Sequence, residues 1–377
     1  MALLSFGSNS CCQLSHVSAE DLYLPTRVPV RELPLSKTTE IRSNGNHTLL
    51  FDRSTNQLFA AGDNAAGQCC VGPEFGASCL SVFKEVQPSV FDPQENWIPE
   101  YVAAGWEFSV IVATHRETCE QAIFVAGAGS KGELALGSDM RSAPVPVRVD
   151  AAELLDGGRR RIVQISAGLA HVVVLLDDFS VWGWGSCRKG QLGSANSALK
   201  CAYVPVRVVD GERLSDWFRP VKVVCGREFT GLIDAEGRVV VLMDNLSKNS
   251  DRHGIVRDVP PAKQVGSDWK DFQCGWSTLH VLLGTGQILS WGNNSHMQHA
   301  PADAPEAELM ACGSEHTLVY SRREGVFAWG WGEHGNCGDS VDRASGDVNV
   351  GRAAKVYEGD VGFLGAGCAT SWIGVGV

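Results

Sequence analysis

Two glycine-rich stretches are the first candidates for chemistry in this sequence of 377 residues. Residues 127–132 (GAGSKG) and 330–335 (GWGEHG) both match G-x-G-x-x-G, the pattern that binds dinucleotide phosphates where a strand turns into a helix. Here each stretch instead follows a short β-rich run inside a repeated unit. The sequence therefore favours a structural loop over a nucleotide site at both places.

The histidines are the next candidates, as ligands or as bases. His47, His171 and His316 occupy one position in different copies of the repeat, so they would not converge on one point. We expect each ring to hydrogen-bond a neighbouring strand. His296 and His299 lie in one loop, but no further ligand is nearby in the sequence, and zinc prefers four. We predict no metal site and no cofactor.

No serine or cysteine lies in a nucleophile context, and no pair of acids has catalytic spacing, so we predict that the protein is not an enzyme. The thirteen cysteines include no C-x-x-C pair. No run of about eighteen apolar residues occurs, which argues against a membrane span. Reduced thiols predict a cytoplasmic protein, with the nucleus left open as a second compartment.

The elements that must position these residues form a repeat. Each copy has a short apolar run that ends at an anchor residue, a second apolar run, and a third run followed by a loop such as 190–193 (GQLG). In the first copy the anchor is asparagine, which we expect to tolerate positive φ. The seven anchors are Asn44, Gly105, Gly168, Gly226, Gly275, Gly313 and Gly367.

Such a small antiparallel sheet cannot bury both of its faces, so its copies must stack. The C-terminus carries an anchor and a second strand, and the N-terminus supplies the missing third strand. We therefore predict an all-β fold, a single seven-bladed β-propeller over residues 1–377, with the N-terminal strand completing the last blade. Residues 1–14 join 360–377, and the other blades lie near residues 37–72, 96–138, 159–194, 218–246, 269–302 and 306–340.

These repeats resemble the regulator of chromosome condensation family, whose blades read roughly A-G-x-x-H-T followed by W-G-x-N-x-x-G-Q-L-G. Residues 167–171 (AGLAH) with 184–193 (WGSCRKGQLG) match this pattern, as do 313–317 (GSEHT) with 329–338 (WGWGEHGNCG). The resemblance covers essentially the whole chain. It is specific for the fold and weak for function, because one fold hosts many activities.

Within this family, an acidic chain that is only a propeller resembles the fungal alpha-tubulin suppressor group, also called killer-toxin-insensitivity propellers. The resemblance implies a regulatory subunit that forms a heterodimer with a small zinc- or iron-binding protein of diphthamide biosynthesis. It also implies a role in Elongator-dependent modification of the tRNA wobble uridine, with Elongator as an indirect partner. We expect no direct DNA contact and no membrane contact.

The two residues after each anchor share one turn position, so they should encircle one face of the propeller. Tryptophan and arginine are common interface anchors, and acids suit a basic partner. The alternative is that both tryptophans fold over their own blades as packing. From these turns we predict the partner-binding residues Trp106, Glu107, Arg227, Glu228, Trp276 and Glu315.

A second function stays open, namely guanine-nucleotide exchange on a Ran-like small GTPase. In the exchanging member of the family, this same turn supplies acids and histidine to the GTPase. Such a protein would need a protruding hairpin, and the longest interval between anchors, from Gly105 to Gly168, leaves little spare chain. The formal net charge of −11 argues against a nucleic-acid-binding surface, since such a surface needs basic residues to neutralise the phosphates.

Overall fold

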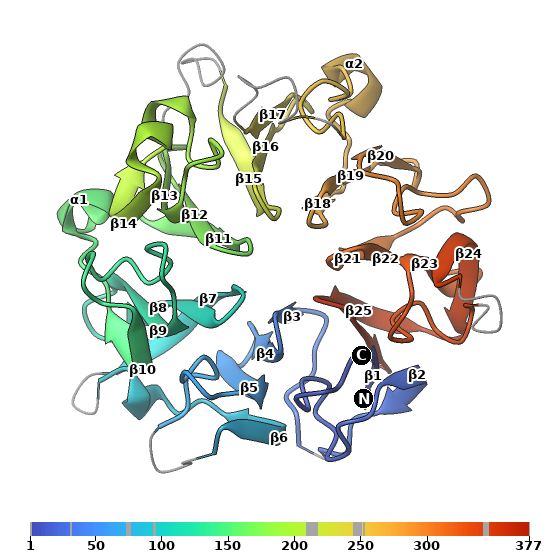
Figure 1. Cartoon of the computed structure of the whole chain (residues 1–377), viewed down its shortest axis with the longest axis horizontal. Coiled ribbons are helices and arrows are strands. Elements are labelled where there is room, and N and C mark those ends of the chain that lie inside the picture. The colour runs from blue at the N-terminus through green and yellow to red at the C-terminus, as the bar shows by residue number, and fades with distance from the viewer. Residues whose placement is uncertain are drawn as a thin grey trace.

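The computed structural model describes residues 2–30, 32–72, 77–92, 96–208, 218–243, 251, 253–341 and 347–376. Within them the chain forms seven antiparallel sheets arranged as blades around a central axis (Figure 1). Five sheets have four described strands and two have three. The prediction of an all-β, seven-bladed propeller is confirmed.

The blades follow one another in chain order. Blade 1 contains β3 (Thr39–Asn44), β4 (His47–Asp52), β5 (Gln57–Asp63) and β6 (Cys79–Glu85). Blade 2 contains β7 (Trp97–Ala104), β8 (Phe108–His115), β9 (Gln121–Ala128) and β10 (Ser142–Arg148). Blade 3 contains β11 (Ile162–Ala167), β12 (His171–Leu176), β13 (Val181–Ser186) and β14 (Cys201–Arg207). Blade 4 contains β15 (Pro220–Cys225), β16 (Thr230–Asp234) and β17 (Val239–Leu242).

Blade 5 contains β18 (Asp271–Cys274), β19 (Thr278–Leu282) and β20 (Ile288–Gly292). Blade 6 contains β21 (Leu309–Cys312), β22 (His316–Ser321), β23 (Gly325–Trp331) and β24 (Asn349–Tyr357). Blade 7 contains β25 (Val361–Ala366), β26 (Thr370–Val375), β1 (Ala2–Gly7) and β2 (Leu22–Arg27). The described helices are short: α1 (Ala152–Leu155), α2 (Ala262–Val265) and 3-10 turns at Pro88–Val90, Asp156–Gly158 and Ser194–Leu199. None of them is long and apolar enough to cross a membrane.

The ring closes within blade 7, where both ends of the chain lie (Figure 1). β1 pairs antiparallel with β26 in unbroken register, from Ala2 opposite Val375 to Gly7 opposite Thr370. The predicted closure by the N-terminal strand is confirmed. Since β1 lies between β26 and β2, β26 has a partner on both sides and leaves no free edge at the closure.

The fourth, outermost strand of a blade is the element that was not predicted from the sequence. Four of these strands lie in segments that read as polar loops: β6, β10, β14 and β24. β10 contains Pro144 and Pro146, and β14 contains Pro205. An outermost strand bonds to only one neighbour, so it tolerates residues that lack an N–H on its outward side. Proline therefore marked an edge strand here and not the end of the sheet.

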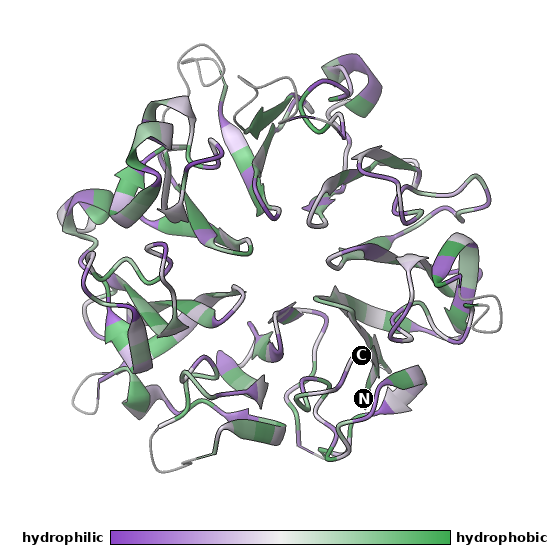
Figure 2. Cartoon of the chain, in the orientation of Figure 1, coloured by the Kyte–Doolittle hydropathy of each residue, from purple (hydrophilic) through white to green (hydrophobic). Residues whose placement is uncertain are grey.

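The core lies within and between the blades. In blades 1, 3 and 6 the second strand is buried along its whole length, because it has strands on both sides and a neighbouring blade against each face. Figure 2 shows hydrophobic residues gathered on the strands and hydrophilic residues in many of the loops. Trp184, Trp329 and Trp372 are completely buried, so the repeat's aromatic positions are core positions.

The anchor glycines serve close packing and not an unusual backbone. None of the six has positive φ. A Cβ on Gly168 would lie 2.3 Å from the Gly226 carbonyl oxygen of the next blade and 2.7 Å from the His171 ring. In the first copy the positive φ belongs to Gly45 (51°) and not to Asn44, whose side-chain oxygen accepts a hydrogen bond from the Gly45 N–H. The expectation for Asn44 was wrong.

Candidate functional site

The repeated histidines join each of three blades to the next. Nε2 of His47 lies 2.9 Å from Ser109 Oγ in blade 2, and that hydroxyl donates to the Gln68 carbonyl oxygen at 2.6 Å. Because the hydroxyl donates to a carbonyl, it accepts its bond from the imidazole N–H. The same relay links His171, Thr230 and Gln191, and then His316, Ser371 and Asn336. The prediction that these rings bond neighbouring strands is confirmed.

These three rings are unsuited to acid–base chemistry. Burial lowers the pKa of His47, His171 and His316 to about 4, so the rings are neutral at pH 7. The loops that spelled G-x-G-x-x-G are likewise structural. The Glu133 carbonyl oxygen directly after the first of them accepts a hydrogen bond from Trp184 Nε1 at 2.8 Å, across the boundary between blades 2 and 3.

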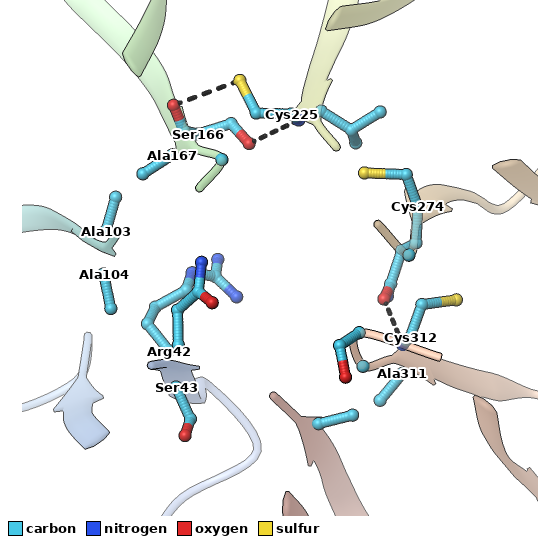
Figure 3. A pocket seen from close by; sticks show the side chains of 18 of the residues that line it. Arg42, Ser43, Ala103, Ala104, Ser166, Ala167, Cys225, Cys274, Ala311 and Cys312 are labelled. Carbon is cyan, nitrogen blue, oxygen red and sulfur yellow. Dashed lines mark hydrogen bonds between the residues drawn. The ribbon is translucent and has the colours of Figure 1, made fainter. Parts of the chain in front are cut away.

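The central channel holds a cavity of about 250 Å³, lined by the innermost strand of each blade. Figure 3 shows Arg42 extending from β3 into its middle. Arg42 forms an ion pair with Glu40 at 2.7 Å. Lys222 forms an ion pair with Asp271. Burial raises the pKa of Glu40, but Arg42 and Arg53 more than offset this, so the carboxyl titrates below its usual range. The channel's cations are thus already paired.

The same channel is bordered by the thiols of Cys225, Cys274, Cys312 and Cys368. The first three are labelled in Figure 3. The Cys225 thiol donates to the Ser166 carbonyl oxygen at 3.4 Å. Burial raises the pKa of Cys225 to about 12 and raises those of Cys274 and Cys312 as well. These groups stay protonated at neutral pH, which disfavours both nucleophilic attack and metal binding.

Metal ligation finds no support in the described part of the chain, where no group of three or more potential ligands comes together. His296 stacks on Trp331, with ring centroids 4.6 Å apart, and its Nδ1 lies 3.1 Å from the Asn349 side-chain oxygen. His299 Nε2 lies 3.2 Å from the Gly292 carbonyl oxygen. The two histidines of this loop therefore have separate structural roles.

One mouth of the channel is spanned by two of the predicted turn residues. Trp106 lies in blade 2 and Trp276 in blade 5, and two or three blades separate them in either direction around the ring. Their ring centroids are nevertheless 5.9 Å apart, with an interplanar angle of 54°. Trp276 also lines the channel cavity. The indoles reach across the opening toward each other, so the alternative of two rings folded over their own blades does not describe this contact.

Backbone hydrogen bonds hold these turns in a ring. The N–H of Trp106 donates to the Leu169 carbonyl oxygen of blade 3 at 3.3 Å. The Arg227 N–H donates to Trp276 in blade 5 at 2.9 Å, and the Trp276 N–H donates to Ser314 in blade 6 at 2.8 Å. These three turns are thereby each bonded to the turn of the next blade, and the side chains after the anchors share one rim.

The charged members of the predicted set are in two different situations. The Arg227 guanidinium lies over the Trp276 ring, 5.7 Å from its centroid, and Glu315 accepts a hydrogen bond from the Gln298 amide. Burial raises the pKa of Glu315, although Gln298, His296 and Arg227 partly offset this. Glu107 and Glu228 are exposed, and within the described residues neither forms an ion pair.

Sequence reasoning missed Arg42 and Lys222 as channel residues. For Lys222 the available signal was a long charged side chain inside a short apolar first strand, PVKVVC, whereas Arg42 lies in the mostly polar strand TEIRSN and gave no such signal. It also missed that Trp106 and Trp276 meet. The two lie 170 residues apart in the chain by their numbers, and no local pattern relates them.

The fold and this rim define a class, that of seven-bladed propellers whose turn face carries aromatic and acidic residues. The Regulator of chromosome condensation (RCC1) repeat model matches residues 180–233. An RCC1 repeat-containing protein of Schizosaccharomyces pombe is 31% identical over 98% of this chain and 98% of its own length. The chain belongs to the RCC1 repeat family.

Other relatives are more distant. The ultraviolet-B receptor UVR8 of Arabidopsis thaliana is 25% identical over 90% of this chain and 75% of its own. Among solved structures, Prp20p of Saccharomyces cerevisiae superposes with a TM-score of 0.75 at 16% identity, over 99% of this chain and 90% of that one. Human WBSCR16 superposes with a TM-score of 0.75 at 14% identity, over 99% of this chain and 98% of that one. At these identities the structural matches show the fold alone.

Proposed function

We propose that this protein is a non-enzymatic binding scaffold that docks a partner protein on the rim around Trp106 and Trp276. The observation that carries the proposal is the indole pair over the channel mouth, accompanied on the same turns by exposed Glu107 and Glu228, which form no ion pair within the described residues. Aromatic rings at the centre of a surface, surrounded by polar groups, are the usual composition of a binding hot spot. The backbone N–H groups of both tryptophans are also hydrogen-bonded to the next blade, so we expect little order to be gained on binding.

For the partner we propose a small zinc- or iron-binding protein of diphthamide biosynthesis, joined as a heterodimer. The protein would then act as a regulatory subunit that also supports Elongator-dependent modification of the tRNA wobble uridine. This finer proposal rests on the resemblance to fungal propellers of that kind. It implies a cytoplasmic site of action, with the nucleus open as a second compartment.

The competing proposal is guanine-nucleotide exchange on a Ran-like GTPase. Its support is a relative named as the secretion-regulating guanine nucleotide exchange factor of Mus musculus, 23% identical over 90% of this chain and 76% of its own. The same rim would then contact the GTPase.

Affinity capture from a fungal extract, read by mass spectrometry, separates the two proposals. The tagged full-length chain is compared with a Trp106→Ala, Trp276→Ala double variant. Recovery of the small metalloprotein by the parent and its loss with the double variant supports the scaffold proposal. Recovery of a GTPase whose release of GDP is accelerated by the parent supports exchange, and equal recovery by both forms would rule out the rim as the binding surface.

A further inference from the structure

The outer face of the Trp106 indole is the most accessible aromatic surface on this rim. Its side chain is 40% exposed, and among the described tryptophans it is the one left most open to solvent. Its inner contact is with Trp276, and its backbone bonds to Leu169. The ring is thus held in place while one surface stays free.

The neighbouring ring already shows what such a face binds. Arg227 places its guanidinium over Trp276, 5.7 Å from the centroid, which is within the range of a cation–π contact. Trp276 therefore contacts both an indole and a cation from its own chain. Among the described residues Trp106 has the indole contact and no cation over its ring, so the place that Arg227 takes on Trp276 is open on Trp106.

The charges beside the free ring favour a cation as well. Glu107 follows Trp106 directly and Glu228 follows Arg227, at the same turn position two blades away. Both are exposed and unpaired within the described chain, whereas the channel acids Glu40 and Asp271 are paired with Arg42 and Lys222. The whole chain carries a formal net charge of −11. A cationic group approaching this rim gains attraction from both the local and the overall charge.

We infer that the rim recognises a basic segment of a partner protein, with one arginine or lysine side chain stacked on the free face of Trp106 and paired with Glu107. This deepens the proposed scaffold function, on which it rests, by specifying the chemistry of the partner's contact. The cation–π contact contributes part of the affinity and strengthens as the partner's side chain is desolvated. The remaining affinity comes from the carboxylates and depends on salt.

Two peptide titrations of the full-length protein, followed by fluorescence anisotropy, test the inference. The probes are a labelled peptide of alternating arginine and glycine and a peptide of equal length with glutamate for arginine. We expect the arginine peptide to bind and the glutamate peptide not to bind. Trp106→Ala should weaken arginine-peptide binding by about three- to thirtyfold. Glu107→Gln with Glu228→Gln should weaken it by about two- to tenfold and flatten its salt dependence.

Matched controls lie on other parts of the surface. Phe179 is 42% exposed and already carries the Arg219 guanidinium 5.4 Å from its ring centroid, so Phe179→Ala removes a comparable aromatic elsewhere. Glu117→Gln with Glu153→Gln removes the same charge from exposed positions outside the rim. Both controls should bind the arginine peptide like the parent. If Trp106→Ala also binds like the parent, or the glutamate peptide binds as well as the arginine peptide, the inference is overturned.

The same variants distinguish this inference from the scaffold proposal. If partner capture is lost with the double tryptophan variant but is indifferent to the carboxylates and to salt, the scaffold proposal stands and the cation inference is wrong. If the arginine peptide binds at Trp106 but the extract yields no protein partner dependent on the rim, the cation site stands and the scaffold proposal is wrong.

Discussion

Nε2 of His171 in blade 3 lies 3.0 Å from Oγ1 of Thr230 in blade 4, and the same hydroxyl donates back to the Gln191 carbonyl oxygen of blade 3 at 2.8 Å. The boundary between the two blades is therefore bridged by a buried polar relay through Nε2 of the histidine. Comparable relays join blades 1 and 2 and blades 6 and 7. Since a blade has little core of its own, such bridges should contribute strongly to the stability of the whole ring.

Removing one relay histidine should be costly. We expect His171→Ala to lower the free energy of unfolding by about 2–3 kcal/mol, because a buried hydrogen bond is lost and a cavity remains. The control is His334→Ala, which removes a surface pairing with Asp21 at 2.8 Å and should cost less than about 1 kcal/mol. Denaturant unfolding measures both, and equal losses would show that the relay adds no stability.

Acid should destabilise the protein well above the range of the carboxylates. Burial lowers the pKa of His47, His171 and His316 to about 4 and that of His280 to about 3, whereas a histidine in the unfolded chain titrates near 6.5. Between these values the unfolded chain binds more protons, so stability is full above pH 6.5 and falls as the pH drops toward 4. The four residues together predict a loss of about 4 kcal/mol between pH 6 and pH 5.

The check is the free energy of unfolding measured across this range. Its slope should correspond to an uptake of about three to four protons on unfolding near pH 5. His171→Gln should reduce that uptake by about one proton. A slope near zero between pH 6 and pH 5 would mean that the folded protein protonates these rings without cost.

The anchor glycines should be intolerant of a methyl group although their backbone is ordinary. Gly168→Ala places a Cβ 2.3 Å from a carbonyl oxygen of the next blade and should cost about 2–4 kcal/mol. Gly351→Ala meets only an ordinary 3.4 Å contact with Met297 and should be nearly neutral. Neither glycine has positive φ, so the two variants differ in the steric contacts of the added methyl group and not in backbone strain. Thermal unfolding of the two variants decides it, and a tolerant Gly168→Ala would contradict the packing explanation.

The indole pair should matter for binding more than for folding. We expect Trp106→Ala with Trp276→Ala to change the free energy of unfolding by about 1 kcal/mol, the size of one aromatic pair, while partner capture is lost. Thermal melting of the purified variant provides the measurement. A collapse of the melting temperature would instead identify the pair as packing that holds opposite blades together.

The channel thiols should be slow to react. Burial raises the pKa of Cys225, Cys274 and Cys312, so almost none of each is thiolate at pH 8. Cys119 is exposed on a hairpin turn and should be alkylated first by iodoacetamide. Mass spectrometry of the intact and digested protein follows the order, and early labelling of a channel thiol would show that the channel is open to reagents and deprotonates its thiols.

Much of the architecture was predictable because it depends on local repetition. The spacing of the anchors and the unmatched strands at the two ends were sufficient for seven blades and for closure by β1. The inter-blade role of His171 also followed from its position, since the same repeat position holds a histidine in three copies and each copy packs against the next. The outer strands were missed because β10 and β14 contain proline, and edge pairing leaves no alternation of apolar residues to detect.

For the candidate site, too, one part could be predicted from the repeat and another part could not. The sequence by itself determined that Trp106, Glu107, Arg227, Glu228, Trp276 and Glu315 share one rim, because a turn position repeated in every blade must recur on one face. Only the tertiary structure decided that Trp106 and Trp276 meet over the channel and that Arg227 lies over the Trp276 ring. It also decided that Glu315 is hydrogen-bonded to Gln298, whereas Glu107 forms no ion pair within the described part of the chain. Those relations depend on the diameter of the closed ring and on side-chain directions across it, which arise from the packing of all seven blades and are encoded in no single repeat.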